Sequence, residues 1–262
     1  MGEPKVVLGL IGKGGTGKTT LSGLFLKAII NLKKSEEFTL VIDADPNECL
    51  PAVLDIKEYS RLGDMISDYY GKTINPVEFK ERFQTHLMQN EQDEYSMLIM
   101  GRGHKLGCYC LINYLLRDSI KGNVLTGDYA FDYILMDCEA GLEHISRETS
   151  TWISDLIVVC DASKMSRDTI KNVADVVEEV RKETPVGNLY VIGNRIRSQK
   201  TVEQLEEQAK KYGMTFLGTV PFDPVIEEAN VEGQSLLAIS EESVAYQTIL
   251  DVLKVIIVAG AD

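Results

Sequence analysis

Short apolar runs rich in β-branched residues recur along the chain and alternate with segments in which apolar residues follow helical spacing. Several runs are almost continuously apolar, which is typical of parallel strands that are covered on both faces. The alternation predicts an α/β fold: a doubly wound, mostly parallel sheet with helices on both faces. The predicted strands are 6–11, 39–42, 96–100, 133–136, 156–159, 189–192 and 215–220, and the predicted helices are 19–32, 110–120, 166–182, 201–212 and 242–258.

A single domain is expected over residues 1–262, because no linker rich in Pro, Gly or Ser, no internal repeat and no low-complexity tract interrupts this alternation. The segment 55–94 is the exception, since it is polar, helix-prone and carries several aromatic residues. We expect a helical insertion or flap over the core there. A partner-docking surface is the functional alternative for the same segment.

A glycine-rich segment follows the first predicted strand and opens the first predicted helix. Its sequence, GKGGTGKTT, matches a phosphate-binding loop in the strand–loop–helix context that such a loop requires. Glycines let backbone N–H groups approach phosphate oxygens, and the helix N-terminus adds partial positive charge. We predict that Lys18 reaches the β- and γ-phosphates of ATP, that the Thr19 hydroxyl is a ligand of Mg²⁺, and that Thr20 contacts the α-phosphate. The predicted ATP-binding residues of this loop are Gly12, Lys13, Gly14, Gly15, Thr16, Gly17, Lys18, Thr19 and Thr20.

Aspartates follow two of the later predicted strands. Asp43 and Asp45 follow the strand at 39–42, and Asp137 follows the strand at 133–136. All three are expected at the carboxyl edge of the sheet, where open α/β sheets bind ligands. An apolar strand that ends in aspartate is the Walker B pattern, which predicts that Asp137 holds Mg²⁺ directly or through water. Asp43 is assigned to the magnesium shell, with a structural hydrogen bond that caps a turn as the alternative.

The lysine at position 13 completes the pattern KGGTGKT. This pattern resembles the deviant Walker A motif of the P-loop ATPase family that includes the septum-site ATPase MinD, the nitrogenase iron protein and metal-insertion ATPases. The resemblance implies a nucleotide-sandwich homodimer in which Lys13 reaches the partner's phosphates and stabilises transition-state charge. A solvent-exposed loop lysine is the alternative. The family resemblance also implies that Asp45 positions or activates the attacking water. The expected catalytic residues are therefore Lys13, Lys18, Asp45 and Asp137.

Two later segments lie where members of that family recognise adenine. Asn194 and Arg195 follow the strand at 189–192, and Pro221 and Phe222 follow the strand at 215–220. The amide of Asn194 can both donate to and accept from a base edge. An asparagine that only caps its loop is the alternative.

Cys108 and Cys110 form a Cys-x-Cys pair in a glycine-containing segment. In an extended chain, residues i and i+2 point the same way and lie roughly 7 Å apart, so two thiolates can converge on one metal ion. Closed thiolate sites need four ligands, and a two-fold axis would supply them from two chains. The pair therefore predicts a transition metal such as zinc shared across a homodimer. Two incidental buried cysteines are the alternative.

The remaining three cysteines have no second cysteine nearby in the sequence. Cys49 and Cys160 are expected to be small core residues, whereas Cys138 adjoins the Walker B aspartate and its role stays open. With five cysteines and no export signal, we expect free thiols or metal ligands in a reducing compartment, and hence a cytoplasmic protein.

The combined motifs resemble the CooC-type accessory ATPases of carbon monoxide dehydrogenase. The resemblance rests on the Lys13 loop, DADPN at 43–47, GCYC at 107–110 and DCEAGLEH at 137–144, and it covers nearly the whole chain. It implies an ATP-driven metallochaperone that assists nickel insertion into carbon monoxide dehydrogenase or acetyl-CoA synthase, the client enzymes. The cysteine at position 138 and the basic residues before the Cys-x-Cys pair depart from that pattern, which leaves the metal and the client open.

Other functions fit the sequence less well. The alternative is an iron–sulfur electron carrier like the nitrogenase iron protein, with a 4Fe–4S cluster held by two cysteines from each chain. Its second cysteine would lie several residues beyond the Walker B aspartate, and residues 141–149 have none. A net charge of −13 argues against general affinity for nucleic acid or anionic lipid, and no segment reaches the roughly 18 apolar residues of a membrane span. No nucleic-acid or membrane partner is expected.

Overall fold

Seven parallel strands form the central sheet of the computed structural model, which describes residues 4–70, 75, 77–78, 81–83, 94–101, 131–138, 153–181 and 187–259. The strand order is β3-β2-β4-β1-β5-β6-β7, so β1 lies mid-sheet between β4 and β5. The predicted doubly wound α/β fold is confirmed. The strands are β1 (Val6–Ile11), β2 (Thr39–Ala44), β3 (Ser96–Ile99), β4 (Tyr133–Cys138), β5 (Asp155–Cys160), β6 (Asn188–Asn194) and β7 (Thr215–Val220).

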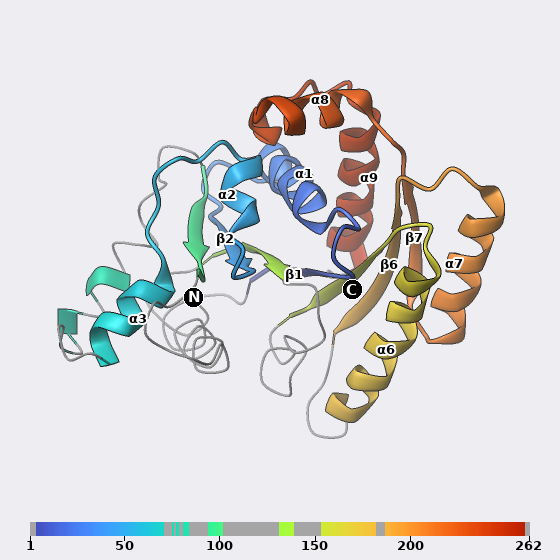
Figure 1. The fold of residues 1–262 in the computed structure, drawn as a ribbon, viewed down its shortest axis with the longest axis horizontal. Helices are drawn as coiled ribbons and strands as arrows, with labels where there is room; N and C mark the ends of the chain where they lie inside the picture. The colour runs from blue at the N-terminus through green and yellow to red at the C-terminus, as the bar shows by residue number, and fades with distance from the viewer. Residues whose placement is uncertain are drawn as a thin grey trace.

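Helices cover both faces of the sheet (Figure 1). On one face lie α1, α2, α8 and α9, and α6 and α7 cover the other. The described helices are α1 (Lys18–Leu32), α2 (Cys49–Val53), α3 (Leu62–Tyr70), α6 (Lys164–Arg181), α7 (Gln199–Lys211), α8 (Pro224–Glu232) and α9 (Val244–Ala259), with a 3-10 turn, η4 (Leu236–Ala238).

The core lies in two layers, one on each face of the sheet. Successive side chains of β1 alternate between them: Val7 and Ile11 join the layer under α6 and α7, and Leu8 and Leu10 join the layer under α1 and α9. Every residue of β1 is buried, which explains why its sequence is continuously apolar rather than alternating. Because burial on both faces favours apolar residues, such strands could be predicted from the sequence.

All seven predicted strands are present, and four of the five predicted helices overlap α1, α6, α7 and α9. The fifth, at 110–120, lies outside the described residues. Within the predicted insertion at 55–94 the structure describes α3, and much of the rest of that segment lies outside the described residues. Helix α8 was not predicted.

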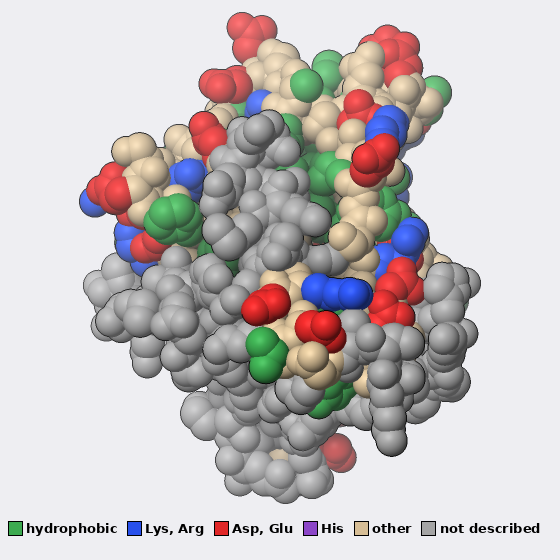
Figure 2. All heavy atoms as spheres, turned by 90° about the vertical axis from the view of Figure 1, so that its left-hand side faces the viewer, with side chains coloured by type: hydrophobic (Ala, Val, Ile, Leu, Met, Phe, Trp, Pro, Cys, Tyr) green, Lys and Arg blue, Asp and Glu red, His purple; other side chains and the backbone are tan. Residues whose placement is uncertain are grey.

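The distribution of surface charge and the apolar character of the helices are relevant to binding of nucleic acid or membrane. On the face shown in Figure 2, acidic side chains are spread over the described surface, and the basic ones lie singly or beside acidic ones. Among the described residues, no helix combines the length and the apolar character needed to cross a bilayer.

Candidate functional site

The glycine-rich loop joins the carboxyl end of β1 to the start of α1, as predicted. Gly12 has φ of 152°, and a Cβ atom there would lie 2.4 Å from the carbonyl oxygen of Val159 in β5. Gly17 is the N-cap of α1 in the left-handed conformation, with φ of 93°. Both positions therefore require glycine, one because of a close backbone approach and the other because of its backbone conformation.

Lys18 folds back over the loop that precedes it. Its side chain is only 7% exposed, and its ammonium donates hydrogen bonds to the carbonyl oxygens of Gly12 at 3.1 Å and Lys13 at 3.5 Å. The Thr16 hydroxyl also donates to the Lys13 carbonyl, at 2.9 Å. These bonds hold the loop closed around a buried cation, which is an arrangement suited to a phosphate group.

Asp137, at the end of β4, is 1% exposed and faces α1. Its Oδ1 accepts a hydrogen bond from the Ser22 hydroxyl at 3.0 Å, whereas its Oδ2 has no hydrogen-bond partner in the described part of the chain. Burial raises the pKa of Asp137 to about 6, against the lowering effect of the Thr19 and Ser22 hydroxyls and of Lys18. A buried carboxylate oxygen beside a threonine hydroxyl fits the donor set that Mg²⁺ prefers.

Asp43 lies directly opposite Asp137 in the register of β2 with β4. Both of its oxygens accept backbone hydrogen bonds at 3.0 Å, Oδ1 from the N–H of Asp45 and Oδ2 from the N–H of Leu50. Burial raises the pKa of Asp43 to about 7, reinforced by the charges of Asp137 and Asp45. These bonds match the structural alternative, in which Asp43 fixes the loop after β2.

Asp45 is half-buried at the start of that loop. Its Oδ1 accepts hydrogen bonds from the backbone N–H and the side-chain amide of Asn47, at 2.8 and 2.9 Å. Asp45 is therefore held in a tight turn at the same edge of the sheet as Asp137. The structure brings together Lys18, Asp43, Asp45 and Asp137 as the sequence predicted.

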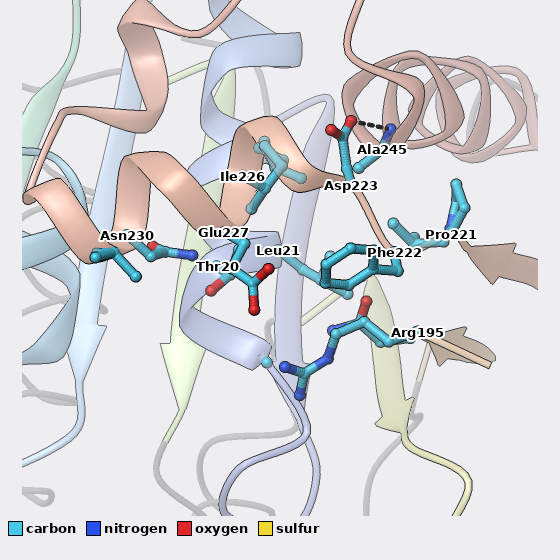
Figure 3. A pocket seen from close by; sticks show the side chains of 15 residues that line it. Thr20, Leu21, Arg195, Pro221, Phe222, Asp223, Ile226, Glu227, Asn230 and Ala245 are labelled. Atoms are coloured by element: carbon cyan, nitrogen blue, oxygen red, sulfur yellow. Dashed lines mark hydrogen bonds between the residues drawn. The ribbon is translucent and has the colours of Figure 1, made fainter. Parts of the chain in front are cut away.

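A pocket of about 280 Å³ opens beside the start of α1. All four residues predicted to contact adenine line this pocket: Asn194, Arg195, Pro221 and Phe222. Figure 3 shows Thr20 on one side of this pocket and Phe222 and Arg195 on the other. The guanidinium of Arg197 lies 5.6 Å from the centre of the Phe222 ring. An aromatic face beside the phosphate loop suits a flat base.

Asn194 and Arg195 also hold the phosphate loop. The buried Asn194 amide donates to the carbonyl oxygen of Thr16 at 2.8 Å, and the Arg195 guanidinium donates to that of Gly15 at 3.0 Å. The Asn194 amide nitrogen would be only 2.3 Å from a Cβ atom at Gly17. The two residues thus connect the predicted base site to the phosphate loop.

Sequence reasoning missed the wall of the pocket that α8 supplies. Glu227 and Asn230 line it, and Figure 3 shows Glu227 beside Thr20. Asp223 is the N-cap of α8 and accepts a hydrogen bond from the N–H of Val225 at 3.0 Å, and Pro224 occupies the first helical position. An Asp-Pro pair after a strand predicts a helix start.

The cysteines give a mixed outcome. Cys108 and Cys110 lie outside the described residues. Cys160 is buried as predicted, but the prediction for Cys49 is wrong, because it is exposed at the first position of α2. Cys138 is buried at the end of β4, and burial raises the pKa of its thiol far above the ordinary range.

Comparison with known proteins decides the family. Residues 9–237 match the model of the CobQ/CobB/MinD/ParA nucleotide binding domain. The chain belongs to this family. Membership in the CobQ/CobB/MinD/ParA family makes it a nucleotide-binding ATPase, in agreement with the phosphate loop and the adjoining pocket.

Two relatives extend over most of the chain. An uncharacterized ATP-binding protein of Methanocaldococcus jannaschii is 32% identical over 260 residues, covering 96% of this chain and 98% of the relative. The carbon monoxide dehydrogenase accessory protein CooC of Rhodospirillum rubrum is 26% identical over 251 residues, covering 89% of this chain and 90% of CooC.

Solved structures share the fold of this family. A ParA family ATPase from Chlorobium tepidum superimposes with a TM-score of 0.70 at 21% identity, covering 95% of this chain and 98% of that structure. The septum site-determining protein MinD of Pyrococcus horikoshii, complexed with Mg-ADP, gives a TM-score of 0.68 at 21% identity, covering 96% of this chain and 95% of that structure. At this level of identity the similarity shows the fold alone.

Proposed function

We propose that the chain hydrolyses MgATP at the edge of the sheet where the phosphate loop meets Asp137. The observation that carries this assignment is the buried Oδ2 atom of Asp137, which has no hydrogen-bond partner among the described residues and lies one strand away from the phosphate loop. A buried carboxylate oxygen without a partner is costly unless a cation or a donor joins it. Thr19 and Asp137 would hold Mg²⁺, which supplies charge neutralisation for the phosphates when bound.

The other residues of the site take supporting roles in this proposal. Lys18 exchanges its present contacts with loop carbonyls for the β- and γ-phosphates. Asp45 orients the attacking water, and Asp43 keeps the loop that bears Asp45 in place through its two backbone hydrogen bonds. The pocket beside Phe222 takes the adenine base.

The cellular role that we propose is the maturation of a metal centre. The similarity to CooC over 89% of this chain supports it, together with the Cys-x-Cys pair at Cys108 and Cys110. In this proposal ATP brings two chains together, and their four thiolates capture a nickel or zinc ion. Hydrolysis then releases the ion to a client nickel enzyme such as carbon monoxide dehydrogenase or acetyl-CoA synthase.

The iron–sulfur electron carrier remains the second candidate, and Cys138 counts against it. A cluster ligand must be a thiolate that is free to reach iron. Cys138 is 1% exposed among apolar side chains, and its raised pKa favours the neutral thiol. Four thiolates from Cys108 and Cys110 of two chains could still hold a cluster. Absorbance near 400 nm in anaerobically purified protein would favour this candidate.

Metal analysis tests the proposed role. We expect the Cys108→Ser/Cys110→Ser protein to keep nucleotide binding and to lose the metal, which wild-type protein should hold at about one ion per two chains. Cys49→Ser is the matched control, because it removes an exposed thiol elsewhere and should leave metal content unchanged. Equal nickel or zinc content in the double variant and the wild type would refute the metal site.

A further inference from the structure

Ser22 occupies a position that the nucleotide-binding motif does not explain. It lies on α1 one turn beyond Lys18, has no exposed surface, and points its hydroxyl at the sheet rather than at the phosphate loop. Its Oγ donates to Oδ1 of Asp137 at 3.0 Å. A serine in a helix interior commonly bonds back to the carbonyl of the preceding turn, so this outward bond across to β4 is a different use of the side chain.

The bond divides the two oxygens of Asp137 between two tasks. Oδ1 is held by a neutral donor, and Oδ2 has no partner among the described residues. With one oxygen fixed, the carboxylate cannot turn freely about its Cβ–Cγ bond, and the orientation of Oδ2 is set. A neutral donor adds no positive charge beside the carboxylate, whereas a lysine or arginine at this place would compete with a bound cation.

We propose that Ser22 is a positioning residue for the nucleotide-bound divalent cation: it orients Asp137 and thereby sets the affinity of the site for the metal. The inference rests on the role of Asp137 proposed above. Hydrogen bonds to a metal-ligating carboxylate fix its direction, and their removal typically weakens metal affinity 10- to 100-fold. The affinity for nucleotide in the absence of metal depends on Lys18 and the loop, whereas the Ser22 hydroxyl bonds to Asp137.

The alternative is that Ser22 only satisfies a buried carboxylate and thereby stabilises the fold. A matched variant separates the two, since Ser67 of α3 is also buried and donates to the carbonyl oxygen of Gly63 at 2.8 Å, away from this site. Ser22→Ala and Ser67→Ala each remove one buried hydroxyl. Only the first is expected to change metal binding.

The test measures metal and nucleotide separately. Binding of a fluorescent ADP analogue is measured in EDTA, and Mn²⁺ binding is measured by EPR with the protein in excess over ADP. For Ser22→Ala we expect nucleotide affinity in EDTA within about 2-fold of the wild type and Mn²⁺ affinity lower by roughly 10- to 100-fold. Ser67→Ala should match the wild type in both, and thermal unfolding without nucleotide checks that each variant is folded.

Asp137→Asn makes the failures distinguishable. If Asp137→Asn loses Mn²⁺ affinity and Ser22→Ala does not, the positioning role is overturned and the role of Asp137 stands. Unchanged Mn²⁺ affinity in Asp137→Asn would overturn both. An equal loss in Ser67→Ala, or a parallel loss of metal-free nucleotide binding in Ser22→Ala, would show general loosening and would also overturn the inference.

Discussion

At the scale of single residues, the burial of Asp137 conflicts with its charge. It is 1% exposed, one oxygen has a neutral donor and the other has no partner among the described residues. Without metal, the burial of this charge is only partly offset by the hydroxyls of Thr19 and Ser22 and the charge of Lys18, and the pKa stays raised at about 6. The conflict predicts that removing this charge changes how stability depends on pH.

Asp137→Asn should therefore stabilise the metal-free protein more at pH 7.5 than at pH 5. The folded pKa of about 6 lies above the ordinary value of 3.8, so the wild type loses stability as the pH rises from about 4 to about 6, and the loss is complete above that. Asparagine does not titrate, so its advantage should grow by at most about 3 kcal/mol over the whole window and by roughly 1.4 kcal/mol between pH 5 and pH 7.5, because pH 5 already lies inside the window. Urea unfolding in EDTA without nucleotide measures the difference in unfolding free energy between the variant and the wild type at each pH. If the unfolding free energies of Asp137→Asn and the wild type differed by the same amount at pH 5 and at pH 7.5, the conclusion that Asp137 is a buried charge would be contradicted.

Gly17 offers a second prediction at this scale, with Gly213 as its control. Both have positive φ, 93° and 68°, so alanine at either costs about 1–2 kcal/mol in backbone strain. At Gly17 the new Cβ would also meet the Asn194 amide nitrogen at 2.3 Å, whereas at Gly213 no atom of the described residues lies within 4 Å. Moving Asn194 breaks its bond to Thr16, so Gly17→Ala should lose about 1 kcal/mol more and should also weaken ATP binding. Unfolding curves and ATP titrations that are indistinguishable for the two variants would contradict this.

At the scale of elements, α1 connects the site to the rest of the molecule. Its first turn carries Lys18, and its next turn reaches β4 through Ser22. Farther along, Lys27 donates to the carbonyl oxygen of Leu237, and Asn31 donates to the hydroxyl of Tyr246 in α9 at 2.6 Å. The position of the phosphate loop thus depends on how firmly α9 packs against α1.

Tyr246→Ala should destabilise the protein by about 3–5 kcal/mol, because Tyr246 is 1% exposed and belongs to the core layer beneath α1 and α9. Val258→Ala is the control on the same helix. Val258 is 66% exposed, so its truncation should change stability by no more than about 0.5 kcal/mol. Denaturant unfolding at one pH compares the two. A similar cost at both positions would mean that α9 is held by something other than its buried face.

At the scale of the whole molecule, the sequence predicts the elements better than their arrangement. Nearly continuous apolar runs made most strands recognisable, because strands buried on both faces carry few polar residues, although β7 is only partly buried. Strand order depends on crossovers, which no local pattern encodes, so the register that places Asp43 opposite Asp137 had to be observed. Cys49 was misassigned because a cysteine at the start of a short helix has no periodicity to show which way it faces. The α8 wall of the pocket was missed through an overlooked helix start.

The last prediction concerns the assembly, and it rests on Lys13. The backbone carbonyl of Lys13 is fixed by the hydroxyl of Thr16 and by Lys18, while its half-buried side chain has no recorded hydrogen bond or ion pair within the described part of the chain. Against the effect of burial, its charge helps to lower the pKa of Asp161, and an ammonium group beside the phosphate loop could instead neutralise phosphate charge on a second copy. Lys13→Ala should therefore bind ATP but remain monomeric.

Light scattering with a non-hydrolysable ATP analogue gives the mass directly, and turnover per chain measured against protein concentration gives an independent signal. We expect wild-type turnover to rise with concentration as dimers form, and that of Lys13→Ala to stay flat and lower by roughly 100-fold or more. Lys200→Ala removes an exposed lysine on α7 and should behave as the wild type. Asp45→Asn adds a check, since it should stay dimeric with ATP while hydrolysis is lost, and adding Lys13→Ala to it should return the monomer. A Lys13→Ala protein that dimerises with the analogue as the wild type does would rule out a lysine acting across the interface.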